Sequence, residues 1–217
     1  MISKQAVRSW NAQVRPGRDG TPPLHEIYVL QRLQAQGSDA SDEANVDFHT
    51  YILPAIFFFE TENFAFIAFP FLDHTDLLEF CAERFNDGGV YHGTCPEELT
   101  VAKWFIQIAS ALAYMHSRMF AHRDVKPDNI LIKSYTGNMR NMALTLGDFG
   151  VAREVTLSPT CCRTVVGTAA FMAPEAVRLA YGLGGTNVPV DVYGAGASMF
   201  YLATMMTPQP DNYEFYY

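Results

Sequence analysis

The sequence has little positive charge and no run of basic residues. Its 217 residues include 15 lysines and arginines against 23 aspartates and glutamates, which gives a net charge of -8. Because an acidic chain repels phosphate backbones, the sequence predicts no nucleic-acid partner. Glycine and proline, with 15 and 12 residues, are at average usage, which excludes collagen-like and low-complexity chains.

Cysteine is scarce, and its spacing excludes two structural roles. None of the four cysteines, Cys81, Cys95, Cys161 and Cys162, stands in a C-x-x-C or cysteine–histidine metal spacing. We therefore expect free thiols in a reducing compartment, and neither a disulfide framework nor a zinc site. Polar and basic side chains interrupt the first ten residues, so no secretory signal is expected. Together these features predict an intracellular, cytoplasmic location.

Long apolar segments are missing too, with one near exception. Residues 192–210 contain no charged side chain, but the part that favours a helix, residues 192–206, spans only 15 residues. At about 1.5 Å per residue this helix is roughly 22 Å long, which is shorter than the roughly 30 Å core of a bilayer. The sequence predicts a buried core helix here and no membrane span.

What the sequence does have is enough apolar material for a sizeable core, since hydrophobic residues make up 49% of it. The apolar spacing in residues 22–33 predicts a helix, and residues 37–47 form a polar loop. Two aromatic-rich runs, 51–59 and 64–72, flank a polar turn. Such runs are typical of an antiparallel pair of buried strands.

A long helix is predicted next, followed by a second hairpin. Its apolar face has the spacing of one helix side and consists of Val101, Trp104, Phe105, Ile108, Leu112 and Met115. Thr94 and Glu97 predict a capping box at its start. Residues 130–132 and 143–146 flank the turn-rich stretch 133–141, which predicts a hairpin with a surface insertion. This order of elements predicts an α+β fold.

Two motifs carry the chemistry. His122-Arg123-Asp124-Val125-Lys126-Pro127-Asp128-Asn129 follows the long helix, and Asp148-Phe149-Gly150 follows the hairpin. In these motifs the sequence resembles the eukaryotic-type protein kinases, specifically the serine/threonine group. The resemblance implies a bilobal fold with a β-rich small lobe in residues 1–72 and a helical large lobe in residues 73–217. Both lobes would be incomplete, and ATP would lie between them.

The resemblance also implies a role for each motif residue. Asp124 would accept or orient the proton of the substrate hydroxyl, and Lys126 would bring positive charge to the γ-phosphate. Asn129 and Asp148 would bind Mg²⁺, which prefers amide and carboxylate oxygens. The predicted hairpin returns the chain, so Asn129 and Asp148 can face one metal cluster.

A later stretch, residues 167–175, resembles the end of an activation segment, with Thr168 typical of serine/threonine specificity. The hydroxyls upstream that could be phosphorylated are Thr156, Ser158, Thr160 and Thr164. The resemblance implies that Arg123 receives this phosphate by bidentate pairing, so we expect activation by loop phosphorylation. Asp191 corresponds to the residue of the family's central helix that braces the catalytic loop.

Further residues are assigned to ATP by the resemblance. Phe69 falls at the gatekeeper position of the hinge, and the backbone of Pro70 and Leu72 would meet adenine. Pro70 is compatible with this because its missing N–H is not the donor normally used. Asp76 would lie near the ribose, and Leu131 is assigned to the same nucleotide site.

The first residues depart from the family pattern. Glu26 fits the glutamate of the family's ion pair, but Arg8, after Ala6 and Val7, stands where its lysine partner is expected. Since a planar guanidinium is no equivalent of an ammonium on the α- and β-phosphates, we expect weakened catalysis. No G-x-G-x-x-G precedes Arg8, and the sequence stops soon after the predicted central helix, as in a kinase domain clipped at both ends.

Three functions stay open at this point. The first is Mg²⁺-dependent transfer of the ATP γ-phosphate to a protein serine or threonine. The second is a pseudokinase that acts as a nucleotide-binding or protein-interaction scaffold, which Arg8 favours and the intact motif residues oppose. The third is a small-molecule phosphotransferase, which the spacing of Lys126 and the activation-segment stretch oppose. A fragment, a partial gene model and a degenerate kinase are equally compatible with the sequence.

Overall fold

The computed structural model describes residues 25–34, 50–60, 65–85, 89, 93–156, 162, 164–183 and 185–208. The helices are α1 (His25–Gln34), α2 (Leu77–Phe85), α3 (Glu98–Ser117), α4 (Pro174–Ala180) and α5 (Pro189–Thr204). The strands are β1 (Phe57–Glu60), β2 (Ala65–Ala68), β3 (Phe120–Ala121), β4 (Ile130–Ser134), β5 (Ala143–Leu146) and β6 (Arg153–Glu154). Short 3-10 turns are η1 (Pro127–Asn129), η2 (Met139–Asn141) and η3 (Ala169–Phe171). The mixture of helices and small sheets agrees with the predicted α+β class.

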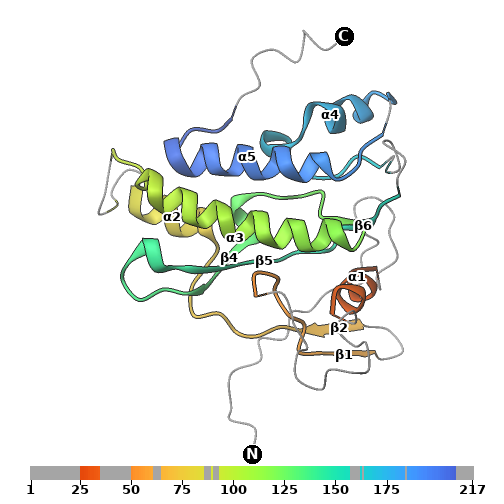
Figure 1. Cartoon of the computed structure of the whole chain (residues 1–217), viewed down its shortest axis with the longest axis horizontal. Coiled ribbons are helices and arrows are strands. Elements are labelled where there is room, and N and C mark those ends of the chain that lie inside the picture. Colours follow the sequence, from red (N-terminus) through yellow and green to blue (C-terminus); the bar gives the residue numbers. More distant parts are fainter. Residues whose placement is uncertain are drawn as a thin grey trace, which may run out of the picture.

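Helix α3 is the longest element and lies at the centre of the described fold (Figure 1). Five of the six predicted apolar positions are buried: Val101, Trp104, Ile108, Leu112 and Met115. The prediction for Phe105 is wrong, because its side chain is 40% exposed. Phe105 directly follows Trp104, and a step of about 100° around the helix turns it away from the core.

The start of α3 also differs from the predicted capping box. Glu97 occupies the N-cap position, and no side chain caps the helix there. The Glu97 carboxylate instead pairs with Arg140 of η2, and the hydrogen bond from Arg140 lowers the pKa of Glu97. The carboxylate is therefore used between elements and not within the helix.

The loop between β4 and β5, predicted as a surface insertion, is exposed along much of its length but anchored to α3. The indole N–H of Trp104 donates to the carbonyl of Met139 at 3.1 Å. The Gln107 amide donates to the carbonyl of Met142 at 3.0 Å and accepts the N–H of Leu144 at 2.9 Å. These bonds hold the hairpin against the helix that precedes the His122–Asn129 motif.

Both predicted hairpins are confirmed. Strands β1 and β2 are antiparallel with Phe59 opposite Phe66, and β4 and β5 are antiparallel with Ile130 opposite Leu146. The first pair is shorter than predicted and only half buried, because Phe57 and Phe59 are 45% and 47% exposed. A third ladder joins β3 to β6.

Helix α5 lies beside α3, on the side away from the β4–β5 hairpin (Figure 1). One face of α5 is buried and includes Asp191, Gly194, Ala195, Ser198 and Leu202. The opposite face leaves Val192 and Phe200 exposed, so the prediction of a core helix is correct for one face only. None of the helices in the described ranges has the length and apolarity that crossing a bilayer requires.

Two other predictions have mixed outcomes. The predicted helix 22–33 is confirmed from residue 25, where α1 begins, and the predicted loop 37–47 lies outside the described residues. Cys81 and Cys95 are free thiols, as predicted, and Cys162 forms no disulfide among the described residues, whereas Cys161 is outside them. Burial raises the pKa of Cys81 to about 12, which makes this thiol unreactive.

Candidate active site

The loop that carries the first motif is fixed by a single buried carboxylate. Asp191 of α5, which is 1% exposed, accepts the backbone N–H of His122 at 2.8 Å and that of Arg123 at 2.7 Å. The Nε2 of His116, on α3, donates to the same carboxylate at 2.8 Å. Asp191 therefore braces the loop, in the way that the resemblance implies. The φ angle of 70° at Arg123 turns the chain sharply at this point.

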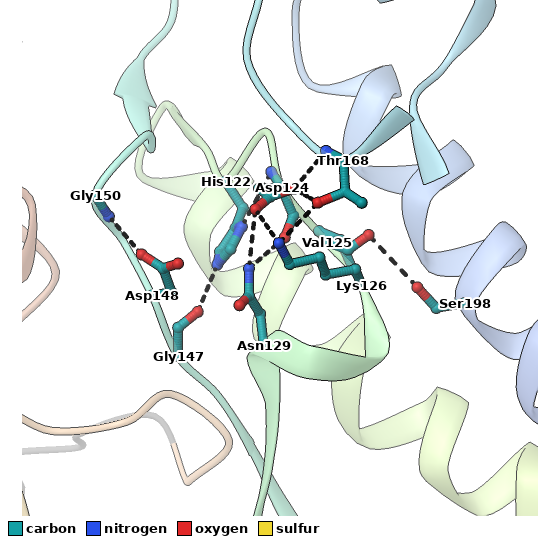
Figure 2. A network of polar contacts seen from close by, with 10 residues as sticks. All are labelled: His122, Asp124, Val125, Lys126, Asn129, Gly147, Asp148, Gly150, Thr168 and Ser198. Atoms are coloured by element: carbon teal, nitrogen blue, oxygen red, sulfur yellow. Dashed lines mark hydrogen bonds and ion pairs between the residues drawn. The ribbon is translucent and has the colours of Figure 1, made fainter. Parts of the chain in front are cut away.

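Asp124 lies at the centre of a network of hydrogen bonds (Figure 2). Its Oδ1 accepts the N–H of Thr168 at 2.9 Å and the Thr168 hydroxyl at 3.2 Å. Its Oδ2 lies 2.9 Å from Nζ of Lys126, which in turn donates to the Thr168 hydroxyl at 2.7 Å. A carboxylate, an ammonium and a hydroxyl are thus held within one small site.

The β4–β5 hairpin brings the second motif to this loop. Because Ile130 pairs with Leu146, the residues just outside the ladder meet, and the N–H of Gly147 donates to the carbonyl of Asn129 at 2.9 Å. Nε2 of His122 donates to the carbonyl of Gly147 at 2.9 Å, and its ring contacts the buried Phe149 edge-on. Asp148 follows directly, with a φ angle of 56°.

Asn129 and Asp148 have oxygen atoms available for a metal ion. The Asn129 amide nitrogen donates to the carbonyl and to Oδ2 of Asp124, at 2.8 and 3.3 Å, so its Oδ1 faces away from Asp124. Asp148 is exposed, and within the described residues its one hydrogen bond is from the N–H of Gly150. A hard amide oxygen and a free carboxylate oxygen fit the ligand class of Mg²⁺. Among the described residues, no group of three or more histidine, cysteine or acidic side chains has an arrangement that could hold a metal ion.

Glu26 reaches this region from the first turn of α1. Its carboxylate accepts the N–H of Phe149, and its Oε2 lies 4.0 Å from the position of a Cβ built on Gly150. Burial, together with the negative charge of Asp148, raises the pKa of Glu26 to about 7. Arg8, the expected partner of Glu26, and Ala6, which the resemblance assigns to the nucleotide site, lie outside the described residues.

Arg123 contacts one of the four proposed phosphorylation sites. Its Nη2 donates to the carbonyl oxygen and the hydroxyl of Thr164, at 2.5 and 2.7 Å. The guanidinium is thus directed at the stretch that carries these hydroxyls. Thr156 is exposed, and its carbonyl accepts the side-chain amide of Asn187, whereas Ser158 and Thr160 lie outside the described residues.

The residues assigned to adenine and ribose are partly buried, and they lie beyond β2 and along β4. Phe69 and Leu72 pack against the main core, and Pro70 stands between them. Leu131 forms a bridge with Asp76 and contacts the position of a Cβ built on Gly147 at 3.1 Å. Oδ1 of Asp76 accepts the N–H of Glu79, which caps α2. Asp76 therefore has a structural role in addition to the role near the ribose that the resemblance assigns.

Three residues that support the site were not indicated by the sequence motifs. His116 anchors Asp191, Gly194 allows α5 to approach Val125, and the hydroxyl of Ser198 donates to the Val125 carbonyl at 3.4 Å (Figure 2). The small residues in the otherwise apolar α5 were a usable signal, since they permit close backbone approach. The sequence offers no such signal for His116, which is 75 residues away from Asp191 along the chain.

Comparisons with known proteins show the family of this chain. Residues 38–215 match the family model described as the protein kinase domain. The rice "Probable serine/threonine-protein kinase WNK8" is 41% identical over 135 residues, which cover 60% of this chain and 20% of that protein. The human "Serine/threonine-protein kinase Nek5" is 29% identical over 210 residues, 95% of this chain and 25% of that protein. The chain spans about a fifth to a quarter of the length of these relatives. It belongs to the protein kinase family.

Proposed function

We propose that the chain transfers the γ-phosphate of ATP to a serine or threonine hydroxyl of a protein substrate. The observation that carries the proposal is the contact of Asp124 with both Lys126 and Thr168. Names of the relatives support serine/threonine specificity, because each is called a serine/threonine-protein kinase.

The chemistry of the network suits phosphoryl transfer. Oδ2 of Asp124 would accept or orient the proton of the incoming hydroxyl, which makes that oxygen a better nucleophile. Nζ of Lys126, 2.9 Å from this carboxylate, would neutralise charge that develops on the transferred phosphoryl group. The Thr168 hydroxyl holds the lysine in place.

The nucleotide would lie between two lobes, residues 1–72 and residues 73–217. Phe69, Pro70 and Leu72 would line the adenine site, with Leu131 below it. The backbone of Pro70 and Leu72 would recognise the base. When bound, Mg²⁺ neutralises negative charge on the phosphates. Asn129 and Asp148 would hold it through the oxygens described above.

Regulation by phosphorylation of the activation segment is part of the proposal. Arg123 already bonds to Thr164, so among the four hydroxyls this one would gain a bidentate, charge-assisted contact on phosphorylation. Replacement of the Thr164 hydroxyl should then abolish activation, whereas an exchange at Thr156 should not.

The test is a phosphorylation assay with Mg-ATP that compares the chain with Asp124→Asn. Loss of a general base lowers the rate by about 10² to 10⁴, while nucleotide binding should persist. Phosphoamino-acid analysis of the product should give phosphoserine or phosphothreonine. Equal labelling by both chains would assign the turnover to a contaminant and support a pseudokinase scaffold. Phosphorylation of a small molecule without any protein product would support the third function considered above.

A further inference from the structure

The first turn of α1 contacts the segment after Asp148 at three points. The Glu26 carboxylate accepts the N–H of Phe149, and Nε2 of His25 donates to the carbonyl of Ala152 at 2.5 Å. The hydroxyl of Tyr28 donates to the carboxylate of Glu154 at 3.1 Å. Of these three contacts, the one made by Tyr28 joins two side chains, and a substitution can therefore remove it cleanly.

Tyr28 touches two strands at once. Its ring lies 6.4 Å from the ring of Phe120, centroid to centroid, while its hydroxyl reaches Glu154. Phe120 and Glu154 are directly opposite each other in the ladder of β3 and β6. Strand β3 leads into the catalytic loop, and β6 follows the Asp148 motif. One side chain of α1 therefore contacts both segments that carry the candidate active site.

We propose that Tyr28 is a positioning residue that, with Glu154 as its acceptor, holds α1 so that Glu26 stays beside Asp148 and Phe149. Buried side chains fix α1 to the core through Ile27, Val29, Leu30 and Leu33. Those apolar contacts determine which face of α1 is buried. The Tyr28–Glu154 contact adds a directional restraint between a side chain of α1 and β6. The expected change in kcat/KM rests on the proposed function, whereas the expected change in hydrogen exchange does not.

The variants isolate the hydrogen bond. Tyr28→Phe keeps the ring on Phe120 and removes the hydroxyl, Glu154→Ala removes the acceptor, and Glu154→Gln keeps an oxygen that accepts. Tyr114→Phe is the matched control, because its hydroxyl also bonds to α1, at the carbonyl of Leu33 in the last turn, 2.7 Å away. Both tyrosine substitutions remove one hydroxyl from a contact with the same helix.

Two measurements are made on each full chain: kcat and the KM for ATP, and amide hydrogen exchange in residues 25–34 and 149–155. We expect Tyr28→Phe and Glu154→Ala each to lower kcat/KM by about threefold and to speed exchange at both segments, since the bond is exposed and its charge is screened. The double variant should be no worse than either single one, and Glu154→Gln should retain most of the activity. Tyr114→Phe should leave kcat/KM unchanged.

Equal effects of Tyr28→Phe and Tyr114→Phe would overturn the proposal, because they would show that any hydrogen bond to α1 supports activity equally. Additive effects of the two exchanges at Tyr28 and Glu154 would also overturn it. If the parent chain transfers no phosphate, the proposed function fails, and hydrogen exchange alone decides the positioning role. Unchanged exchange in residues 149–155 of Tyr28→Phe would then contradict it.

Discussion

The carbonyl oxygen of Val125 lies only 2.9 Å from the point where the Cβ of an alanine at Gly194 would stand. Val125 belongs to the loop of the first motif and Gly194 to α5, so the missing side chain sets the distance between the two. Because the nearest atom is a backbone oxygen and not the end of a flexible side chain, a side chain at position 194 would force the backbone to shift. The position of Asp124, the next residue before Val125, therefore depends on a glycine 70 residues further along the chain.

Gly194→Ala should destabilise the fold by about 1 to 3 kcal/mol because the added methyl overpacks the contact. Gly196→Ala is the matched control on the same helix, since nothing lies within 4 Å of a Cβ at that position. Alanine there should be neutral or stabilise by up to about 1 kcal/mol through its higher helix propensity. Urea unfolding of the three chains measures both effects, and equal midpoints for the two variants would contradict this close approach.

Asp191→Asn should unfold more easily and lose activity. The carboxylate accepts two backbone N–H groups and the His116 ring, and an amide has one oxygen fewer to accept them. A buried donor without a partner costs about 1 to 3 kcal/mol. Glu98→Gln, an exposed exchange in the first turn of α3, should cost almost nothing. Thermal melts compare the two, and an unchanged melting temperature for Asp191→Asn would count against the bracing role.

Thr145→Val should keep or raise stability. The Thr145 hydroxyl is buried in β5 and has no hydrogen-bond partner among the described residues. Valine has nearly the same shape and removes the unsatisfied group. Thr145→Ser, which keeps the hydroxyl and loses the methyl, should instead destabilise. Chemical unfolding of both variants tests this, and a large loss for valine would reveal a partner of the hydroxyl.

Stability should depend on pH through Glu26. Its pKa in the folded chain, about 7, lies above the ordinary value of 4.5, so folding favours the protonated form. The stabilising contribution is complete below about pH 4.5 and is lost as the pH rises through about 7. Glu26→Gln is neutral at every pH. Measured without nucleotide, the free energy of unfolding of Glu26→Gln should rise relative to that of the parent chain between about pH 5 and pH 8. A constant difference across that range would refute the raised pKa.

The sequence was sufficient where a local pattern or a matched motif decided the outcome. The apolar spacing of α3, the two hairpins and the glycine-containing α5 were predictable, because periodicity and turn residues act over a few positions. The motif from His122 to Asn129 also indicated which side chains share a site. Helix α2 was missed, although Leu77, Phe80 and Cys81 follow helical spacing after Asp76.

The rest depended on partners distant in the sequence. Glu97 does not form the predicted capping box, because its carboxylate pairs with Arg140, 43 residues further along the chain. Phe57 and Phe59 are exposed because one face of β1 and β2 points away from the core. The local sequence shows that these strands are apolar but does not show which face of them the core covers. The contacts of Asp191 with His116 and with the backbone of His122 also depend on residues far apart in the sequence.

We propose that the β4–β5 hairpin joins Asn129 and Asp148 into one metal–nucleotide site. Titration of ATP with and without Mg²⁺ tests it on the parent chain, on Asp148→Asn and on Asp73→Asn, an exposed control. We expect Mg²⁺ to tighten ATP binding to the parent and the control but not to Asp148→Asn. Equal tightening in all three chains would contradict it.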